Sequence, residues 1–410
     1  MNEQNSMSRR DFLRISGGAV SGIAITTALS GCVRPGTNAC EMLPVLEGYR
    51  PKVTSAWIAK GEHEASYDLF KQVVEGTTDF SWLSSGDKVL LKLSINSGNP
   101  FPATTDPWTL DCMIRLLKEK GVENADIFVG DQSGVEHVML SENSQQGSSR
   151  DLCASTGLLS IITDHGVTPC FFEERGWEGY IEATLPQGFH HWSVPMYITN
   201  AVEDVDHIIY LSRVASHVLS EYTSAMKMGI GFLRDDSRLI FHQGGEDFYA
   251  MYEEVNAVEE ISSKLRLVVT SGRKVLSTFG PDNGFITEPD HGLLIASEDF
   301  LANDILGFSW LRWNYDYITS EDAKFISYVL KNNSTLTKRV VTNMRTSGIK
   351  GGKTITPTIP RFNKDDIYCH PSMINYMERK GGFPEEIVWQ QLNSNPDSSI
   401  EQYIKDLIEV

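Results

Sequence analysis

The chain has 410 residues, of which 41% are hydrophobic and 22% are charged, as is typical of a folded globular protein. This composition excludes a wholly disordered chain, a collagen-like fibre and a membrane protein with many spans. The 54 acidic residues outnumber the 36 basic ones and give a formal net charge of -18. Because nucleic acids and anionic lipids attract basic surfaces, we expect no nucleic-acid partner.

The first 31 residues have the features of an export signal. Arg9 and Arg10 stand side by side, Phe12 follows them, and residues 15–30 are weakly apolar. This segment is shorter than the ~20 mainly apolar residues that a stable membrane span needs. The pattern resembles a twin-arginine signal, so we expect the twin-arginine export machinery to be a partner. The alternative is a disordered or helical N-terminal tail.

The signal ends in Leu29-Ser30-Gly31-Cys32, which resembles a bacterial lipobox. Cleavage before Cys32 leaves a thiol that takes a diacylglyceryl group, and each buried CH₂ of the acyl chains contributes about 0.8 kcal/mol to anchoring. We therefore expect an exported lipoprotein on the extracytoplasmic face of a membrane, in the periplasm or at the cell surface, with residues 32–50 as a tether. The alternative is a plain signal peptide with an incidental cysteine.

The six cysteines include no C-x-x-C pair. We therefore expect neither an iron–sulfur cluster nor a zinc ribbon, and the sequence identifies no cofactor. Cys112 and Cys170 lie in apolar patterns and are expected to be small buried hydrophobic residues.

Strand-like and helix-like segments alternate through residues 51–311. We expect strands at 52–59, 87–95, 125–129, 168–172, 207–211, 265–271 and 292–296. We expect helices at 64–74, 107–120, 149–165, 219–230, 247–263 and 298–311. Such alternation predicts an α/β fold with a mostly parallel, helix-covered sheet, in which ligands bind beyond the carboxyl ends of the strands.

Residues 312–410 have a different character. Residues 338–362 are rich in Gly, Thr and Pro, and short helices are expected to follow them. We interpret 312–410 as a smaller irregular C-terminal extension that packs on the core.

Polar side chains gather where the predicted strands end. They are Lys92, Asp131, Ser133, Arg213, Ser216, His217, Lys227, Asp299 and Asp304. Each of them alone can be explained as a cap, an ion-pair partner or a solvated residue; Asp299, for example, suits the first turn of a helix. Their shared location is informative, because neighbouring carboxyl ends of parallel strands converge in space.

We predict that Lys92, Asp131, His217 and Lys227 are catalytic and lie within ~12 Å of a common point at one sheet edge. The other five residues are predicted to bind ligand. Lys and Arg hold carboxylate or phosphate, and His transfers protons near neutral pH, so the set suits a small anionic ligand. In the opposing interpretation, His217 caps a turn and Lys227 points to solvent.

A metal site is a weaker prediction. Asp131, Glu136, His137, His217 and His242 offer oxygen and nitrogen ligands, but no two of them have the spacing that fixes two ligands on one element. Whether a metal binds is therefore left open.

Over residues 51–310 the sequence resembles a bacterial and archaeal family, the domain of unknown function family numbered 362. The segments that carry the resemblance are 92–94 (KLS), 104–107 (TTDP), 130–133 (GDQS), 211–217 (LSRVASH), 225–228 (AMKM) and 299–304 (DFLAND). Lys92, Asp131, His217, Lys227 and Asp304 match the family pattern. The resemblance implies an α/β fold and a site at these positions, but no settled activity.

Four positions depart from the family pattern. Asp106 replaces a His, Ala215 a Lys, and both Met228 and Ser94 an Asn. If the family shares one chemistry, these departures imply that this member has lost or altered it. Two hypotheses follow: an enzyme or cofactor-handling protein that acts on a small anionic ligand, or a non-catalytic lipoprotein that binds a solute or partner.

Overall fold

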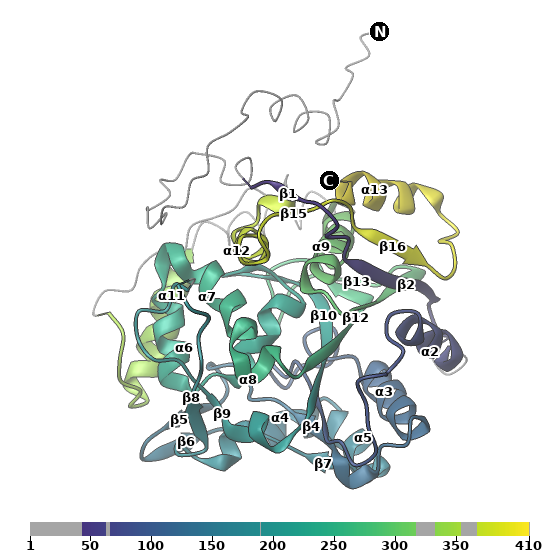
Figure 1. Ribbon diagram of the computed structural model, residues 1–410. Coiled ribbons are helices and arrows are strands. Elements are labelled where there is room, and N and C mark those ends of the chain that lie inside the picture. Colours follow the sequence, from purple (N-terminus) through teal and green to yellow (C-terminus); the bar gives the residue numbers. More distant parts are fainter. Residues whose placement is uncertain (1–42, 63–65, 189, 317–332, 354–366, 410) are drawn as a thin grey trace.

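The computed structural model describes residues 43–62, 66–188, 190–316, 333–353 and 367–409. A large twisted sheet runs through the molecule and carries helices on both faces (Figure 1). Its strands lie in the order β16 (Val388–Gln391), β2 (Lys52–Ala59), β14 (His291–Ser297), β12 (Leu265–Leu276), β10 (His207–His217), β3 (Val89–Lys92), β4 (Ile127–Gly130) and β7 (Thr168–Pro169). Within this order β14 is antiparallel to both neighbours and the other pairs are parallel. The predicted α/β fold with a mostly parallel sheet is confirmed.

The central strands are buried on both faces, which explains their nearly continuous apolar sequence. In β10, Ile208 and Tyr210 face one hydrophobic core, whereas Ile209 and Leu211 face the other. The alternation follows from the two-residue period of a strand.

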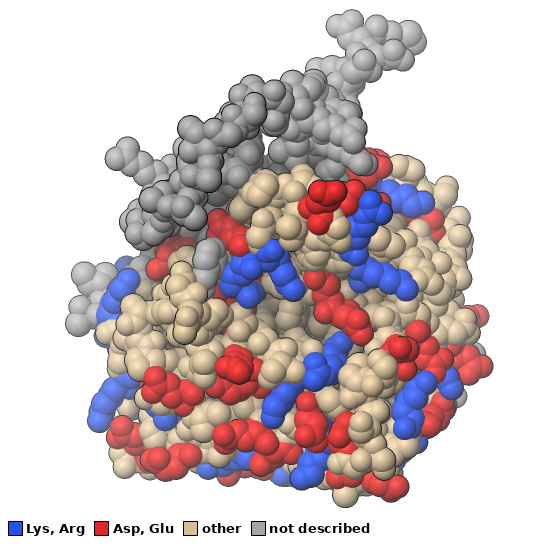
Figure 2. Space-filling model, viewed as in Figure 1, with Lys and Arg blue, Asp and Glu red and all other residues tan. Residues whose placement is uncertain are grey.

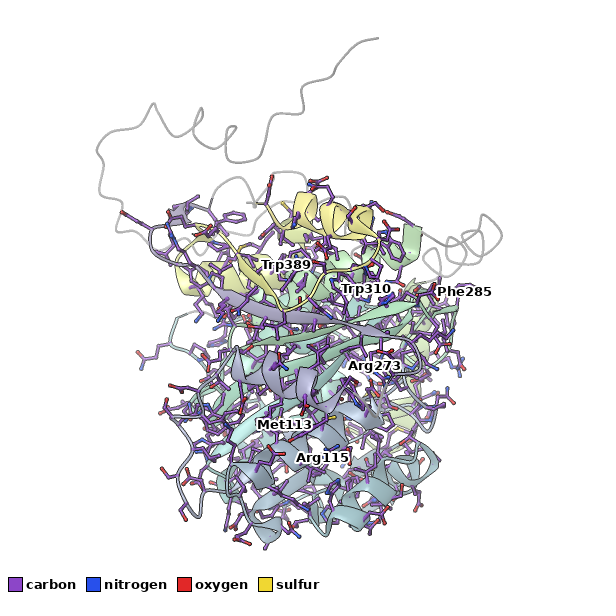
Figure 3. The ribbon with its side chains drawn as sticks, turned by 90° about the vertical axis from the view of Figure 1, so that its right-hand side faces the viewer. Met113, Arg115, Arg273, Phe285, Trp310 and Trp389 are labelled. Carbon is purple, nitrogen blue, oxygen red and sulfur yellow. The ribbon has the colours of Figure 1, made fainter. Side chains whose placement is uncertain are left out.

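Helices close both cores. One face carries α2 (Tyr67–Glu75), α3 (Pro107–Glu119), α4 (Ser149–Ser155) and α5 (Leu158–His165). The other carries α6 (Asp235–His242), α7 (Phe248–Glu254), α8 (Glu259–Ser262), α9 (Phe300–Asp316), α12 (Pro371–Lys380) and α13 (Ser398–Ile408). Figure 3 shows Met113 of α3 on one side of the sheet and Trp310 of α9 on the other. The helix α11 (Asn333–Thr346) packs on α6 through a small separate apolar cluster.

The helix predicted at 219–230 is wrong. Instead, β10 turns back into the short antiparallel strand β11 (Glu221–Thr223), and a 3-10 helix, η6 (Ala225–Phe232), follows. The predicted strand at 207–211 accordingly extends to His217. The reason is local: Nδ1 of His217 accepts hydrogen bonds from the backbone N–H groups of Leu219 (3.0 Å) and Ser220 (3.2 Å) and so stabilises the reversal.

Two other predicted helices are interrupted. The helix expected at 149–165 is split into α4 and α5 at Gly157, whose φ of 82° is left-handed. The helix expected at 247–263 is split into α7 and α8 by a 3-10 turn, η8 (Val255–Ala257).

The C-terminal residues join the main sheet. β16 pairs parallel to β2, and Nε1 of Trp389 in β16 donates to Oγ of Ser55 at 2.8 Å. A second short strand, β15 (Phe383–Pro384), pairs with β1 (Val45–Leu46), so part of the expected tether also packs on the fold. Figure 1 shows these elements grouped at one end of the molecule. The sequence predicts only short helices here, because Val388-Trp389-Gln390-Gln391 has no apolar run.

Two hairpins and two buried cysteines are the remaining features relevant to the predictions. Two hairpins, β5 (Met139–Ser141) with β6 (Ser144–Gln146) and β8 (Tyr180–Glu182) with β9 (Tyr197–Thr199), lie outside the main sheet. Cys112 and Cys170 are buried with free thiols, as expected. Among the described helices, none has both the length and the apolar character needed to cross a bilayer.

Candidate functional site

Two adjoining hollows lie beyond the carboxyl ends of β3, β4 and β10. The inner recess has a volume of about 70 Å³ and is lined by polar groups that include Lys92, Asp131 and Arg213. The outer chamber, of about 300 Å³, is lined by His137, His217 and His242 and by apolar side chains. Residues on the wall shared by both hollows include Lys227, Arg238 and Asn96. The volume of the outer chamber is at the lower end of the range for small-molecule sites.

The inner recess is built on a buried ion pair. Lys92 is the last residue of β3 and pairs in register with Gly130, so Asp131 follows directly beside it. Nζ of Lys92 lies 2.8 Å from Oδ1 of Asp131, and the two side chains are only 2% and 6% exposed. Nζ also donates to the carbonyl of Leu93 at 2.9 Å, and Asp131 accepts from the backbone N–H of Ile95 at 2.8 Å. Both groups are therefore held in place before any ligand binds.

Burial lowers the pKa of Lys92, as does the positive charge of Arg238, while Asp131 acts in the opposite direction. Gly231 packs directly over the pair, where an added Cβ would overlap both Nζ of Lys92 and Oδ1 of Asp131. A glycine is therefore required here, because the backbone of η6 must approach the ion pair closely.

Lys227 projects from η6 into the wall between the two hollows and remains partly exposed. Within the described part of the chain its ammonium has no hydrogen-bond or ion-pair partner. Burial lowers the pKa of Lys227 to about 7; the charge of Arg213 lowers it further, and Asp282 opposes the shift. Near neutral pH this side chain therefore exists both as an ammonium and as a free amine.

Arg213 supplies a fixed positive charge to the inner recess. Its Nη1 donates to the carbonyl of Pro102 at 3.0 Å, and its Nη2 donates to that of Pro281 at 3.4 Å. The residue is 2% exposed, burial lowers the pKa of its guanidinium to about 10, and its Nε–H has no partner among the described residues. An unpaired buried donor is unfavourable, and the guanidinium has no ion-pair partner among the described residues, so an anion in the recess that Arg213 lines would offset its charge.

Three histidines line the outer chamber in different states. His217 uses Nδ1 as an acceptor, which places its ring proton on Nε2. His242 donates from Nδ1 to the carbonyl of Arg238 at 2.7 Å, so its Nε2 carries a lone pair; burial lowers the pKa of His242 to about 4 and keeps it neutral. Asp282, 3.2 Å away, raises the pKa of His137 by hydrogen bonding.

Sequence reasoning missed the structural role of Arg238. Its guanidinium donates to the carbonyls of Gln132 (3.2 Å), Ser133 (2.6 Å) and Gly231 (2.9 Å), and so joins the Asp131 loop to η6. Asp235 lies 3.6 Å away, and burial raises the pKa of its carboxyl group to about 6. No motif signals this role, because the partners are backbone atoms that only the fold brings together.

The predicted catalytic residues occupy both hollows. Lys92, Asp131 and Lys227 line the inner recess, whereas His217 lines only the outer chamber. The reason is the length of β10: Lys92 is level with Tyr210, and β10 continues to His217, about 20 Å further along the strand direction. Lys227 is the residue that connects the two groups.

Four of the five residues predicted to bind ligand line neither of these two hollows. Ser133 lies behind the Asp131 loop, where its N–H donates to Oγ of Ser149 at 2.9 Å. Ser216 faces β11 and donates to the carbonyl of Glu221 at 3.4 Å. Of the predicted ligand-binding residues, only Arg213 lines the inner recess.

Asp299 and Asp304 are the other two predicted ligand-binding residues that line neither hollow. Asp299 follows β14, the antiparallel strand, and so lies at the opposite edge of the sheet. It accepts hydrogen bonds from Tyr49 (2.8 Å) and Tyr376 (2.9 Å). Asp304 is fully buried in α9, accepts from the N–H groups at the start of η6, and therefore supports the element that carries Lys227.

The proposed metal ligands do not form a cluster. The described residues contain no group of three or more His, Cys, Asp or Glu side chains arranged to hold a metal ion. Asp131 is committed to Lys92, and His137 to Asp282.

On the face shown in Figure 2, acidic and basic side chains are interspersed. In the two hollows, Lys227 is a cation without a described partner. Their chemistry suits a small organic anion.

The chain is similar to one protein-family model and to seven chains of solved structures. The family described as "Domain of unknown function (DUF362)" matches residues 89–309, which include Lys92, Asp131, His217 and Lys227. No curated protein matches the sequence. The lactate racemase apoprotein from Thermoanaerobacterium thermosaccharolyticum is similar at 13% identity and a TM-score of 0.37, over 60% of this chain and 54% of that one. This chain thus spans about half the length of that protein.

Proposed function

Since the chain belongs to the DUF362 family and its matched segment contains the inner recess and most of the outer chamber's lining, we propose that it is an enzyme or cofactor-handling protein acting on a small organic anion. The observation that carries this proposal is Lys227, an amine without a described partner between a polar recess and a larger chamber. A lysine with a lowered pKa can bind an anion when protonated and transfer a proton when neutral.

In this proposal each neighbouring residue of the two hollows has a distinct role in binding, proton transfer or positioning. Arg213 and protonated Lys227 bind the anionic group, Lys227 exchanges protons with the ligand, and His217 offers its Nε2–H as a hydrogen-bond donor in the outer chamber. Lys92 and Asp131 neutralise each other and hold the floor of the recess rigid, so that the ligand meets a preorganised surface.

Chemical labelling of Lys227 tests the proposal and does not require the substrate to be identified. An amine-acylating reagent is applied from pH 5 to pH 10, alone and with a panel of carboxylates and phosphates, and each labelled lysine is quantified by mass spectrometry. We expect Lys227 to label with a midpoint near pH 7 and to be protected at least fivefold by ligands that bind. The exposed Lys88 serves as the internal control and should not be protected. Labelling of Lys227 that no anion slows would contradict the proposal.

The alternative, a solute-binding protein without chemistry, is favoured by one observation. Met228 lines the inner recess at the position where the family pattern has Asn, which removes a polar group from the site. A binder would bind its anion without converting it, and its affinity would fall smoothly as Lys227 loses its proton. An enzyme would instead convert a bound anion, with a rate that bends near pH 7.

We also propose that the protein is exported by the twin-arginine machinery and anchored to a membrane through lipidated Cys32. Arg9, Arg10 and Cys32 lie outside the described residues, so their sequence context carries this proposal. Further support comes from Cys369, which is disulfide-bonded. Disulfides persist mainly in oxidising, extracytoplasmic compartments.

Two substitutions test export and anchoring separately. Replacing both Arg9 and Arg10 with Lys should leave the precursor in the cytoplasm, and normal export of this variant would exclude the twin-arginine route. Cys32→Ser should release exported protein from the membrane fraction. If this variant stays membrane-bound after a high-salt wash, the anchor lies elsewhere.

A further inference from the structure

We propose that Lys227 is a nucleophile that forms an imine with the carbonyl carbon of a 2-oxo acid whose carboxylate is held by Arg213. This inference rests on the proposed function and deepens it by naming the substrate class. It begins from the arrangement of an amine without a described partner, that of Lys227, and the guanidinium-bearing side chain of Arg213 in the lining of the same small recess.

The two lysines of the recess are not equivalent. Nζ of Lys92 is fixed by Asp131 at 2.8 Å and by the carbonyl of Leu93 at 2.9 Å, so its lone pair is not available to a ligand. Lys227 has neither kind of contact with any described residue. Desolvation and a neighbouring cation are the two conditions that produce a nucleophilic lysine, and here they are burial and Arg213.

The size of the recess limits the group that it takes. A cavity needs roughly 10–15 Å³ of such volume for each water molecule, so about 70 Å³ holds a fragment of a few heavy atoms. A carboxylate and an adjacent carbonyl meet this limit. The positive charge of Arg213 attracts the carboxylate to this recess, and the adjacent carbonyl carbon is then held in the cavity that Lys227 also lines.

The outer chamber receives the rest of the molecule. Phe241, Phe279, Leu336 and Val340 give it apolar walls, in contrast to the charged inner recess. An oxo acid with an aromatic or branched aliphatic side chain therefore fits the two hollows better than pyruvate does, because its side chain leaves water for an apolar surface.

The chemistry is a condensation and needs no oxidant or reductant. The amine lone pair of Lys227 attacks the carbonyl carbon, a C–N bond forms, and the carbonyl oxygen gains a proton to give a carbinolamine. The nitrogen loses a proton, the hydroxyl group is protonated and leaves as water, and a C=N bond results. Nε2 of His242 carries a lone pair, and the charge of Lys227 influences the pKa of His242. His242 can therefore carry the proton from nitrogen to the departing oxygen.

Reductive trapping tests the imine directly. The purified protein is incubated at pH 7.5 with phenylpyruvate and sodium cyanoborohydride, and the modified peptide is identified by mass spectrometry. We expect a stable adduct on Lys227, formed at least tenfold faster than on Lys88. Lys227→Met should abolish this adduct, while an unchanged circular dichroism spectrum confirms that the variant is folded.

Two comparisons isolate the carboxylate and the apolar chamber. Phenylacetaldehyde lacks the carboxylate, and it should lose the selectivity for Lys227 over Lys88 that phenylpyruvate shows. Pyruvate should trap Lys227 more slowly than phenylpyruvate does. Arg213→Met should reduce trapping by phenylpyruvate at least tenfold and leave trapping by the aldehyde nearly unchanged. The ligand comparison keeps the test valid if this variant does not fold.

The outcomes separate the two proposals. Protection of Lys227 by anions without any adduct from an oxo acid would overturn the imine and leave the anion site standing. Absence of both protection and adduct would overturn both. Equal trapping of Lys227 and Lys88 would show ordinary amine reactivity and also overturn the imine.

Discussion

At the scale of single residues, we expect the buried ammonium of Lys227 to lower the free energy of unfolding relative to an apolar side chain at the same position. The pKa of its ammonium is about 7 in the folded chain and about 10.4 in an unfolded one, so the unfolded chain binds more protons between these values. The free energy of unfolding therefore rises with pH across this window, and the destabilisation is complete below pH 7. We expect Lys227→Met to raise the free energy of unfolding by about 1–3 kcal/mol at pH 7.

Urea denaturation at pH 7 and pH 10 measures this effect. The gain from Lys227→Met should shrink at pH 10, while Lys88→Met, at an exposed position, should change stability by less than about 0.5 kcal/mol at either pH. A Lys227→Met variant that is stabilised but no longer protected by anions would show that the residue serves function at the expense of stability. If Lys227→Met instead lowers the free energy of unfolding, and lowers it more at pH 7 than at pH 10, the ammonium of Lys227 is not a buried unpaired charge.

The Lys92–Asp131 pair should behave in the opposite way. Removing one member leaves a buried charge without its partner, so Lys92→Met or Asp131→Asn alone should lower the free energy of unfolding by about 3–5 kcal/mol. The double variant should be more stable than the sum of the two single losses implies, because it leaves no uncompensated charge. A double-mutant cycle by denaturation measures this coupling, and strictly additive losses would show that the pair is not coupled.

At the scale of elements, the position of Lys227 depends on Asp304. The carboxylate of Asp304 accepts from the N–H groups of Ala225 (2.9 Å) and Met226 (3.0 Å), the residues that begin η6. Asp304→Asn replaces one acceptor oxygen with a donor and should loosen this start. We expect it to weaken anion protection of Lys227 about tenfold and to shift its labelling midpoint, although Asp304 does not line either hollow.

Asp299→Asn is the matched control for this prediction. Asp299 caps the start of α9 and accepts from Tyr49 and Tyr376, at the far edge of the sheet. Its substitution should lower the melting temperature without moving the labelling midpoint of Lys227. If both variants move the midpoint equally, Asp304 acts through general stability and is not a positioning residue.

These elements also show what the sequence can and cannot predict. Apolar runs such as 208–211 predict buried parallel strands, and the residues after β3 and β4 could therefore be assigned to one sheet edge. The spacing of Leu219, Tyr222, Met226 and Ile230 suggested a helix, but the side chain of His217 stabilises a reversal there and strand pairing prevails. The sequence does not predict that Asp299 lies at the opposite edge of the sheet, because the antiparallel direction of β14 depends on tertiary pairing, which has no local signature.

At the scale of the whole molecule, the chemical state of each cysteine bears on whether the chain is lipidated. Of the six cysteines, Cys112, Cys153 and Cys170 have free thiols and Cys369 is disulfide-bonded. Cys32 and Cys40 lie outside the described residues. A thioether-linked lipid would consume the thiol of Cys32, so lipidation at Cys32 predicts that Cys40 is the disulfide partner of Cys369.

Thiol counting therefore tests anchoring independently of membrane fractionation. Cys112, Cys153 and Cys170 have free thiols and Cys369 is disulfide-bonded. If Cys32 carries the lipid and Cys40 is bonded to Cys369, an alkylating reagent should label only Cys112, Cys153 and Cys170 in protein extracted from membranes and denatured without reductant. Reduction should add Cys40 and Cys369 and leave Cys32 unlabelled. The variant Cys369→Ser should label Cys40 without reductant, which serves as the control. Labelling of Cys32 after reduction would show that its sulfur was held in a disulfide and not in a lipid thioether, and the membrane anchor would then have to be sought elsewhere in the chain.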